Sequence, residues 1–104
     1  MNSQMTRRIA DLLTICNKAR KTVKGFDSVC DSVKNGKAFC VLTASDASAR
    51  TLKEVAFVCG KCGVPVIDTG MLKEELAVLC GKNTAVIAVC DKGFADAFGR
   101  IFKE

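Results

Sequence analysis

The sequence predicts an α/β protein in which helices cover both faces of a sheet. Short apolar runs of strand length alternate with amphipathic stretches of helical spacing, which is the pattern of a helix, sheet, helix sandwich. The chain has 104 residues, of which 49% are hydrophobic, and a single proline. A chain of this length folds as one domain that buries roughly two thirds of its unfolded surface. We therefore expect one domain over residues 1–104, without a linker or an internal repeat.

Helical periodicity and one apolar run define the first half of the chain. Apolar residues recur at helical spacing over Ser3 to Lys18, which predicts an amphipathic first helix. A second, short helix begins near Gly25 and stops at the turn signal Asn35-Gly36. The continuous apolar run from Ala38 to Ala44 predicts a central strand that is covered on both faces.

The second half continues this alternation of helices and strands. Ser45-Asp46 offers an N-cap for a third helix that runs to about Cys62 and ends at Gly63, and helix capping also accounts for Ser48 better than catalysis does. The predicted inner face of this helix consists of Ala49, Leu52, Val55, Ala56 and Cys59. The remaining predicted elements are a buried strand, a short helix stopped by Gly81, a third strand and a last helix, at Val64–Ile67, Leu72–Leu79, Thr84–Cys90 and from about Gly93.

The composition argues against a membrane protein, a secreted disulfide scaffold and an enzyme. The apolar runs are far shorter than the roughly 20 residues that span a bilayer, and the N-terminus lacks the apolar core of a signal peptide. Seven cysteines are an odd number, spread through apolar positions. Without histidine, tyrosine or tryptophan, acid–base chemistry near neutral pH would need a strongly perturbed group. We expect a soluble, cytoplasmic, non-catalytic protein with no cofactor or metal.

One cysteine pair has the spacing of a zinc knuckle or a redox pair. Cys59 and Cys62 form a C-x-x-C. A zinc site needs four ligands, and the sequence has no second such pair and no histidine, while a thioredoxin-like pair opens a helix instead of closing one. We interpret Cys59 as a core residue and Cys62 as a half-exposed helix end. A thiol oxidoreductase is the weaker alternative.

The net charge of +5 is concentrated in one segment. Residues 17–37 carry six lysines and arginines against two aspartates, whereas eight basic residues match eight acids from Ala38 to the end. A localised basic patch attracts polyanions, so nucleic acid is the first partner to consider. Lys21 and Lys24 lie beside Gly25 at a predicted helix start, where free backbone amides add to their charge and predict a phosphate site, to which Arg20 adds a planar donor. The alternative is a solvated lysine face.

A set of short motifs runs through the chain in order and without large gaps from about Arg8 to Phe98. They are Leu12-Leu13, Lys21 with Gly25, Gly25 and Gly36 bracketing a helix, Ser45-Asp46-Ala47-Ser48 with Thr51, Val64-Pro65-Val66, Gly81-Lys82 and Asp91-Lys92-Gly93-Phe94-Ala95. Together they resemble the ribosomal kink-turn-binding superfamily, which holds the archaeal large-subunit protein seven-Ae and the eukaryotic thirty-e protein. The similarity is greatest to its small bacterial YlxQ-type branch.

The resemblance implies a three-layer α-β-α sandwich around a mixed four-stranded sheet, with a short extra strand near Thr22-Val23. It also implies binding of structured RNA, with ribosomal RNA among the candidates, and we expect a monomer. In the family, RNA is held at the start of the second helix and by a facing loop, which correspond here to Lys21 through Asp31 and Gly81 through Thr84. The predicted RNA-binding residues are Arg20, Lys21, Lys24, Gly25, Asp27, Ser28, Asp31, Lys37, Gly81, Lys82 and Asn83.

The chain departs from the family pattern in the second helix. Tight kink-turn binders carry an asparagine, a glutamate and a lysine there, and the matching residues are Asp27, Ser28 and Asp31; the glycine usual before Lys21 is Arg20. Two carboxylates facing RNA would repel it, so general RNA affinity is favoured over kink-turn specificity. We interpret Asp27 and Ser28 as helix-capping residues. The alternative function is a protein interaction module on the same fold that has lost kink-turn recognition.

Overall fold

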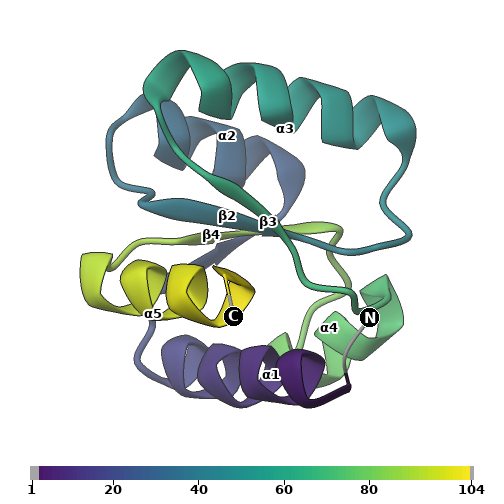
Figure 1. Ribbon diagram of the computed structural model, residues 1–104. Helices are drawn as coiled ribbons and strands as arrows, with labels where there is room; N and C mark the ends of the chain where they lie inside the picture. The colour runs from purple at the N-terminus through teal and green to yellow at the C-terminus, as the bar shows by residue number, and fades with distance from the viewer. Residues whose placement is uncertain (1–2, 104) are drawn as a thin grey trace.

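The computed structural model describes residues 3–103 and has three layers, with helices on both faces of one sheet (Figure 1). Helices α2 and α3 cover one face, and α1, α4 and α5 cover the other. The predicted sandwich is therefore confirmed. Among the described helices, none is long and apolar enough to cross a membrane. In chain order the elements are α1 (Ser3–Lys18), β1 (Thr22–Lys24), α2 (Phe26–Lys34), β2 (Cys40–Thr43), α3 (Ala49–Cys62), β3 (Val66–Asp68), α4 (Lys73–Cys80), β4 (Val86–Val89) and α5 (Lys92–Lys103).

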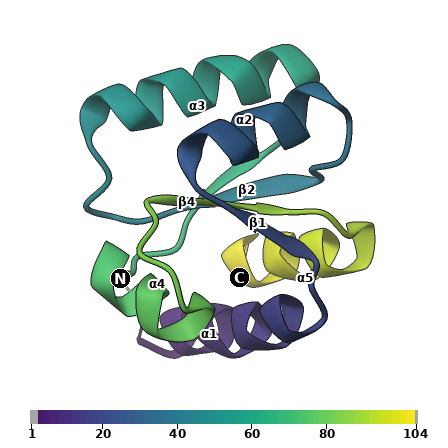
Figure 2. The same ribbon diagram turned by 180° about the vertical axis from the view of Figure 1, so that it is seen from behind.

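The sheet is mixed, and its strand order is β1-β4-β2-β3. Strand β4 pairs antiparallel with both β1 and β2, while β2 pairs parallel with β3. Strand β1 is the short strand that the resemblance implied near Thr22-Val23, and Val23 pairs with Ala88 of β4. Figure 2 shows β1 running from the end of α1 to the start of α2. This strand therefore brings the beginning of α2 to one edge of the sheet.

Both faces of the two interior strands are buried, which accounts for their unbroken apolar sequences. On β2, Cys40 and Leu42 join the core beneath α1, α4 and α5, whereas Val41 joins the core beneath α2 and α3. The first core includes the large side chain of Phe98. The second core consists of small residues such as Val55, so α2 and α3 lie over a thin apolar layer.

The strand predicted at Val64–Ile67 is not buried on both faces. It is β3, which lies at the edge of the sheet and has neighbouring residues alternately exposed and buried. Ile67 packs in the core beneath α1, α4 and α5, while Val66 is 38% exposed. A short apolar run looks the same in an edge strand and an interior strand, so the sequence did not distinguish them.

The inner face predicted for α3 is partly wrong. Val55 and Cys59 are buried as expected, but Leu52 and Ala56 are exposed and Ala49 is also exposed at the first position of the helix. Alanine occurs on either face of a helix, so apolar periodicity alone assigned Ala49 and Ala56 to the wrong face of α3.

The polar residues before α3 divide their roles between two helices. Ser48, and not Ser45-Asp46, is the N-cap of α3, and its Oγ accepts from the Thr51 amide at 3.1 Å. Asp46 instead accepts from the Lys73 amide at the start of α4, at 2.9 Å. Helix capping therefore accounts for Ser48 and Asp46, although the predicted cap position was wrong.

Arg20 has an unusual backbone conformation at the end of α1. Its φ is +60°, and among residues 3–103 it is the one non-glycine residue with a positive φ. Its amide donates to Asn17 O at 3.0 Å, and the Lys21 amide donates to Cys16 O at 3.1 Å. These two bonds form a Schellman motif, in which the residue at the Arg20 position is usually glycine. The left-handed backbone at this position explains the glycine of the family pattern.

Replacing Arg20 with glycine should stabilise the fold by about 1 kcal/mol, because an L-residue in the left-handed region is strained by roughly that amount. For a chain of this length, this corresponds to a rise in melting temperature of about 5 °C. The control is Arg20→Ala, which removes the same charge but keeps the strained conformation and should bring no such gain. Thermal and urea unfolding of the three proteins would measure the difference, and equal stability of the glycine and alanine variants would contradict the assignment.

Candidate functional site

A tight turn at Gly25 joins β1 to α2 and fixes where the helix begins. Gly25 has φ +97° and ψ 144°, a combination that essentially only glycine adopts. Its amide donates to Thr84 Oγ1 at 3.1 Å and to Val86 O at 3.4 Å, and its carbonyl accepts from the Val29 amide at 2.9 Å. The start of α2 is therefore attached to a segment 59 residues later in the chain.

Thr84 is the residue that makes this attachment. Its side chain is buried, and its hydroxyl donates to Val86 O at 2.6 Å while accepting from the amides of Gly25 and Val86. The sequence placed Thr84 at the end of the facing loop but did not predict that its side chain anchors the loop. A threonine just before an apolar run was the available signal, and it is weak because threonine is common in strands.

Lys82 lies directly over the start of α2. Its Nζ is 3.7 Å from the position that a Cβ on Gly25 would take. No side chain among residues 3–103 makes a capping hydrogen bond at the start of this helix, so its first amides have no side-chain partner there. Lys82 forms no ion pair within the described part of the chain. An ammonium held near the positive end of a helix is unfavourable by itself, and an anion placed between the two would be stabilised by both.

Lys24 is held by contacts within the protein. Its Nζ donates to Asn17 Oδ1 at 3.0 Å and to Cys80 O at 3.2 Å, and Asn17 Oδ1 also accepts from Thr22 Oγ1 at 2.9 Å. Cys80 is the last residue of α4, where a cation interacts favourably with the helix dipole. Lys24 therefore ties the ends of α1 and α4 to β1, and a direct phosphate contact would compete with these bonds.

The other predicted residues fall into three groups. Gly81, Lys82 and Asn83 are exposed and belong to the segment that Thr84 brings to the start of α2. Arg20 and Lys21 are also exposed, but they lie at the other end of β1, where the Cys90 amide donates to Lys21 O, about 13 Å of strand from Gly25. Lys37 follows the C-terminal end of α2 instead, and nine residues of helix place it about 13 Å farther along. The structure therefore does not bring Lys37 together with the turn at Gly25.

The sequence of the chain matches a known family over most of its length. Residues 7–98 match the ribosomal protein L7Ae/L30e/S12e/Gadd45 family. The chain belongs to this family.

Two relatives, each named RNA-binding protein YlxQ, come from Bacillus subtilis (strain 168) and Enterococcus faecium. The first is 40% identical over 89 residues, which are 82% of this chain and 85% of the relative; the second is 28% identical over 95 residues, 91% of each. The resemblance to the YlxQ-type branch is thus confirmed.

Solved structures agree with this assignment. A protein with unknown function from Bacillus halodurans C superimposes with a TM-score of 0.86 at 31% identity, over 91% of this chain and 96% of the other. The Giardia lamblia 15.5kD RNA binding protein superimposes with a TM-score of 0.76 at 21% identity, over 99% and 85%. The second likeness shows that the L7Ae-type fold is shared.

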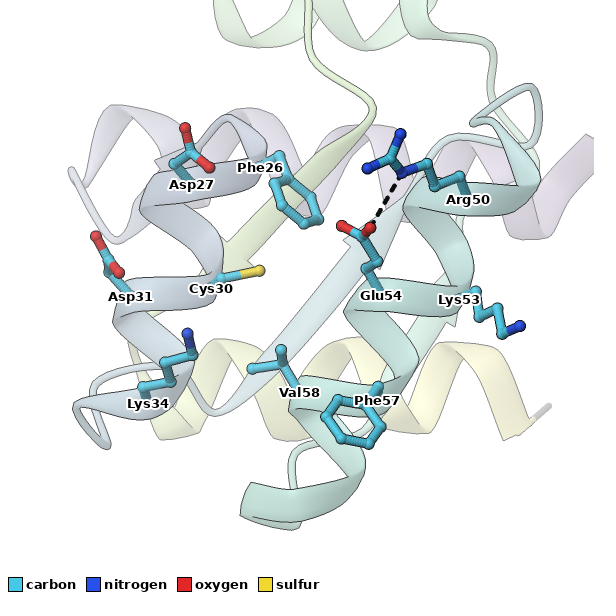
Figure 3. A pocket seen from close by; sticks show the side chains of 10 residues that line it. All are labelled: Phe26, Asp27, Cys30, Asp31, Lys34, Arg50, Lys53, Glu54, Phe57 and Val58. Carbon is cyan, nitrogen blue, oxygen red and sulfur yellow. Dashed lines mark hydrogen bonds and ion pairs between the residues drawn. The ribbon is translucent and has the colours of Figure 1, made fainter.

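Asp27 and Ser28 do not cap α2, contrary to the interpretation from sequence. The N-cap is Gly25, and the two residues lie within the first turn, on the solvent side of the helix. Figure 3 shows the carboxylates of Asp27 and Asp31 on the side of α2 that points away from α3. Asp27 still interacts favourably with the helix dipole, while Asp31 lies one turn farther from it. In this L7Ae-family protein, the helix that follows the glycine turn therefore presents negative charge to solvent.

Five of the seven cysteines are buried core residues. Cys59 is buried and Cys62 is exposed at the end of α3. Burial raises the pKa of Cys59 to about 11 and that of both Cys16 and Cys40 to about 12, so these thiols stay protonated near neutral pH. Within residues 3–103, no three residues of the types that bind metals are grouped closely enough to hold an ion.

Proposed function

We propose that this protein binds structured RNA, without catalysis, at the turn between β1 and α2 and the facing loop at residues 81–84. The observation that carries the proposal is the ammonium of Lys82 held over the uncapped start of α2. A phosphate between them would accept from the helix amides and from Lys82. Lys21, exposed at the other end of β1, would contact a second phosphate of the same RNA. The names of the two relatives support RNA as the anion.

The strain at Arg20 supports a second RNA contact, at the end of β1 opposite to the Gly25 turn. A residue keeps an unfavourable backbone conformation most often where it serves a function, and Arg20 is exposed just before Lys21. Its planar guanidinium can donate to two phosphate oxygens at once, which neither glycine nor lysine can do. We propose that Arg20 is kept in this strained backbone conformation because its guanidinium contacts a phosphate of the RNA. The partner would be structured RNA, ribosomal RNA included, bound in the cytoplasm by a monomer.

Replacing both Lys21 and Lys82 with glutamine should weaken RNA binding about equally for different sequences, because phosphate contacts carry no base information. The dependence of log affinity on log salt concentration should flatten by roughly one unit for each phosphate that the variant no longer neutralises. The matched control is Arg100→Gln with Lys103→Gln, which removes the same charge from α5. Filter binding or fluorescence anisotropy over a range of salt concentrations would measure both. Equal reductions in affinity for the two double variants would mean that net charge, and not this site, binds RNA.

Affinity for a standard kink-turn should be weak compared with a structured-RNA control, because Asp27 and Asp31 supply carboxylates where tight binders supply an amide and an ammonium. An unpaired buried donor costs roughly 1 to 3 kcal/mol, so the reduction in affinity should reach about tenfold. Asp27→Asn, Ser28→Glu and Asp31→Lys together should restore the preference. Binding of a kink-turn by the unmodified protein at nanomolar level, measured by the same anisotropy assay, would show that these three positions do not decide specificity.

A further inference from the structure

A groove of about 810 Å³ lies between α2 and α3, on the outer side of these helices. Figure 3 shows Phe26 and Cys30 of α2 pointing toward α3, and Val58 of α3 pointing toward α2. Phe57 lies at one end of the groove and is 66% exposed. The side chains of Phe26, Cys30 and Val58 form the apolar bottom of the groove, which stays open to solvent.

The two sides of this groove differ in net charge. Asp27 and Asp31 outnumber Lys34 on α2, while Arg50 and Lys53 outnumber Glu54 on α3. Arg50 Nε pairs with Glu54 Oε1 at 3.2 Å, which leaves Lys53 as the α3 cation of the groove without an ion pair among the described residues. The aspartates are separated by four residues, one turn of helix or about 6 Å. An ion pair with each of them would need two cations at the same spacing.

We propose that this groove binds an amphipathic helix of a partner protein. Its apolar stripe would cover Phe26, Val58 and Phe57. Lysines or arginines four residues apart would lie over Asp27 and Asp31, and acidic residues on the other flank would lie over Lys53. A helix matches the site because its side chains repeat at the spacing of the aspartates and its apolar ridge can pack into the groove between two neighbouring helices. This inference does not rest on RNA binding.

Two other occupants fit less well. RNA gains no net attraction from the rim, because its three carboxylates, Asp27, Asp31 and Glu54, balance its three cations, Lys34, Arg50 and Lys53. A second copy of the chain would set one groove against another, and two concave surfaces leave a void that close packing excludes. A convex partner with sorted charges suits both the shape and the rim.

The probe for the test is a displayed library of randomised helices about three turns long, selected on the purified protein. The enriched helices should share an apolar stripe with basic residues four apart on one flank. Phe57→Ser should weaken their binding at least about tenfold, as expected for an aromatic anchor. The matched control is Phe102→Ser, another half-exposed phenylalanine on α5, which should leave binding unchanged. Both positions are exposed, so neither change should prevent folding.

A second variant separates this proposal from the proposed RNA site. Asp27→Asn with Asp31→Asn should weaken the selected helices, because it removes the charges that their basic flank contacts, and should strengthen RNA binding, because it removes repulsion. The proposal is overturned by any of four results: no enrichment over a selection on the Phe57→Ser protein, enriched helices without a basic flank, loss of RNA affinity in Phe57→Ser, or a dimer of the chain that Phe57→Ser dissociates.

Discussion

The hydrogen bonds from the Gly25 amide to Thr84 Oγ1 and Val86 O attach the start of α2 to the segment that leads into β4. They fix a glycine-specific turn against the start of β4, so α2 can begin at one place only. Because α2 begins there, its uncapped start lies close to the ammonium of Lys82. Without this attachment, Lys82 and the helix start would be two unconnected surface features.

Lys24 helps to fix the position of the loop at residues 81–84 relative to β1. Its ammonium joins Asn17, near the end of α1, to the last carbonyl of α4, and the loop at residues 81–84 starts at that carbonyl. A lysine that looks like part of a basic patch in the sequence is therefore a structural element of the site. The exposed cations that remain available to a ligand are Lys82, beside the Gly25 turn, and Arg20 and Lys21, at the other end of β1.

Helix α2 thus has two surfaces of opposite character. Its N-terminal end offers amides and a nearby ammonium to an anion, whereas its outer side carries Asp27 and Asp31. Carboxylates so close to the proposed anion site would reduce RNA affinity, and the proposed partner helix would give them a different use. If both proposals hold, the protein would join an RNA to a second protein across one short helix.

Much of the fold followed from the sequence, whereas parts of the site did not. Helical periodicity located α1 and α2 closely, and the apolar run of β2 identified an interior strand, because local residues dictate both features. The edge position of β3 and the orientation of α3 depend on what packs against them, which a single sequence does not record. The roles of Thr84 and Lys24 rest on hydrogen bonds to residues more than fifty positions away, and the groove arises only when α2 and α3 pack.

The most direct test of the central claim is an amide chemical-shift titration of the protein with a structured RNA. The account predicts that the largest shifts occur at the amides of Phe26 to Ser28 and of Lys82 to Thr84, because a phosphate would bind between these segments. Shifts confined to other surfaces, such as α5 or the outer side of α3, would contradict the claim that the Gly25 turn and the facing loop form one anion-binding site.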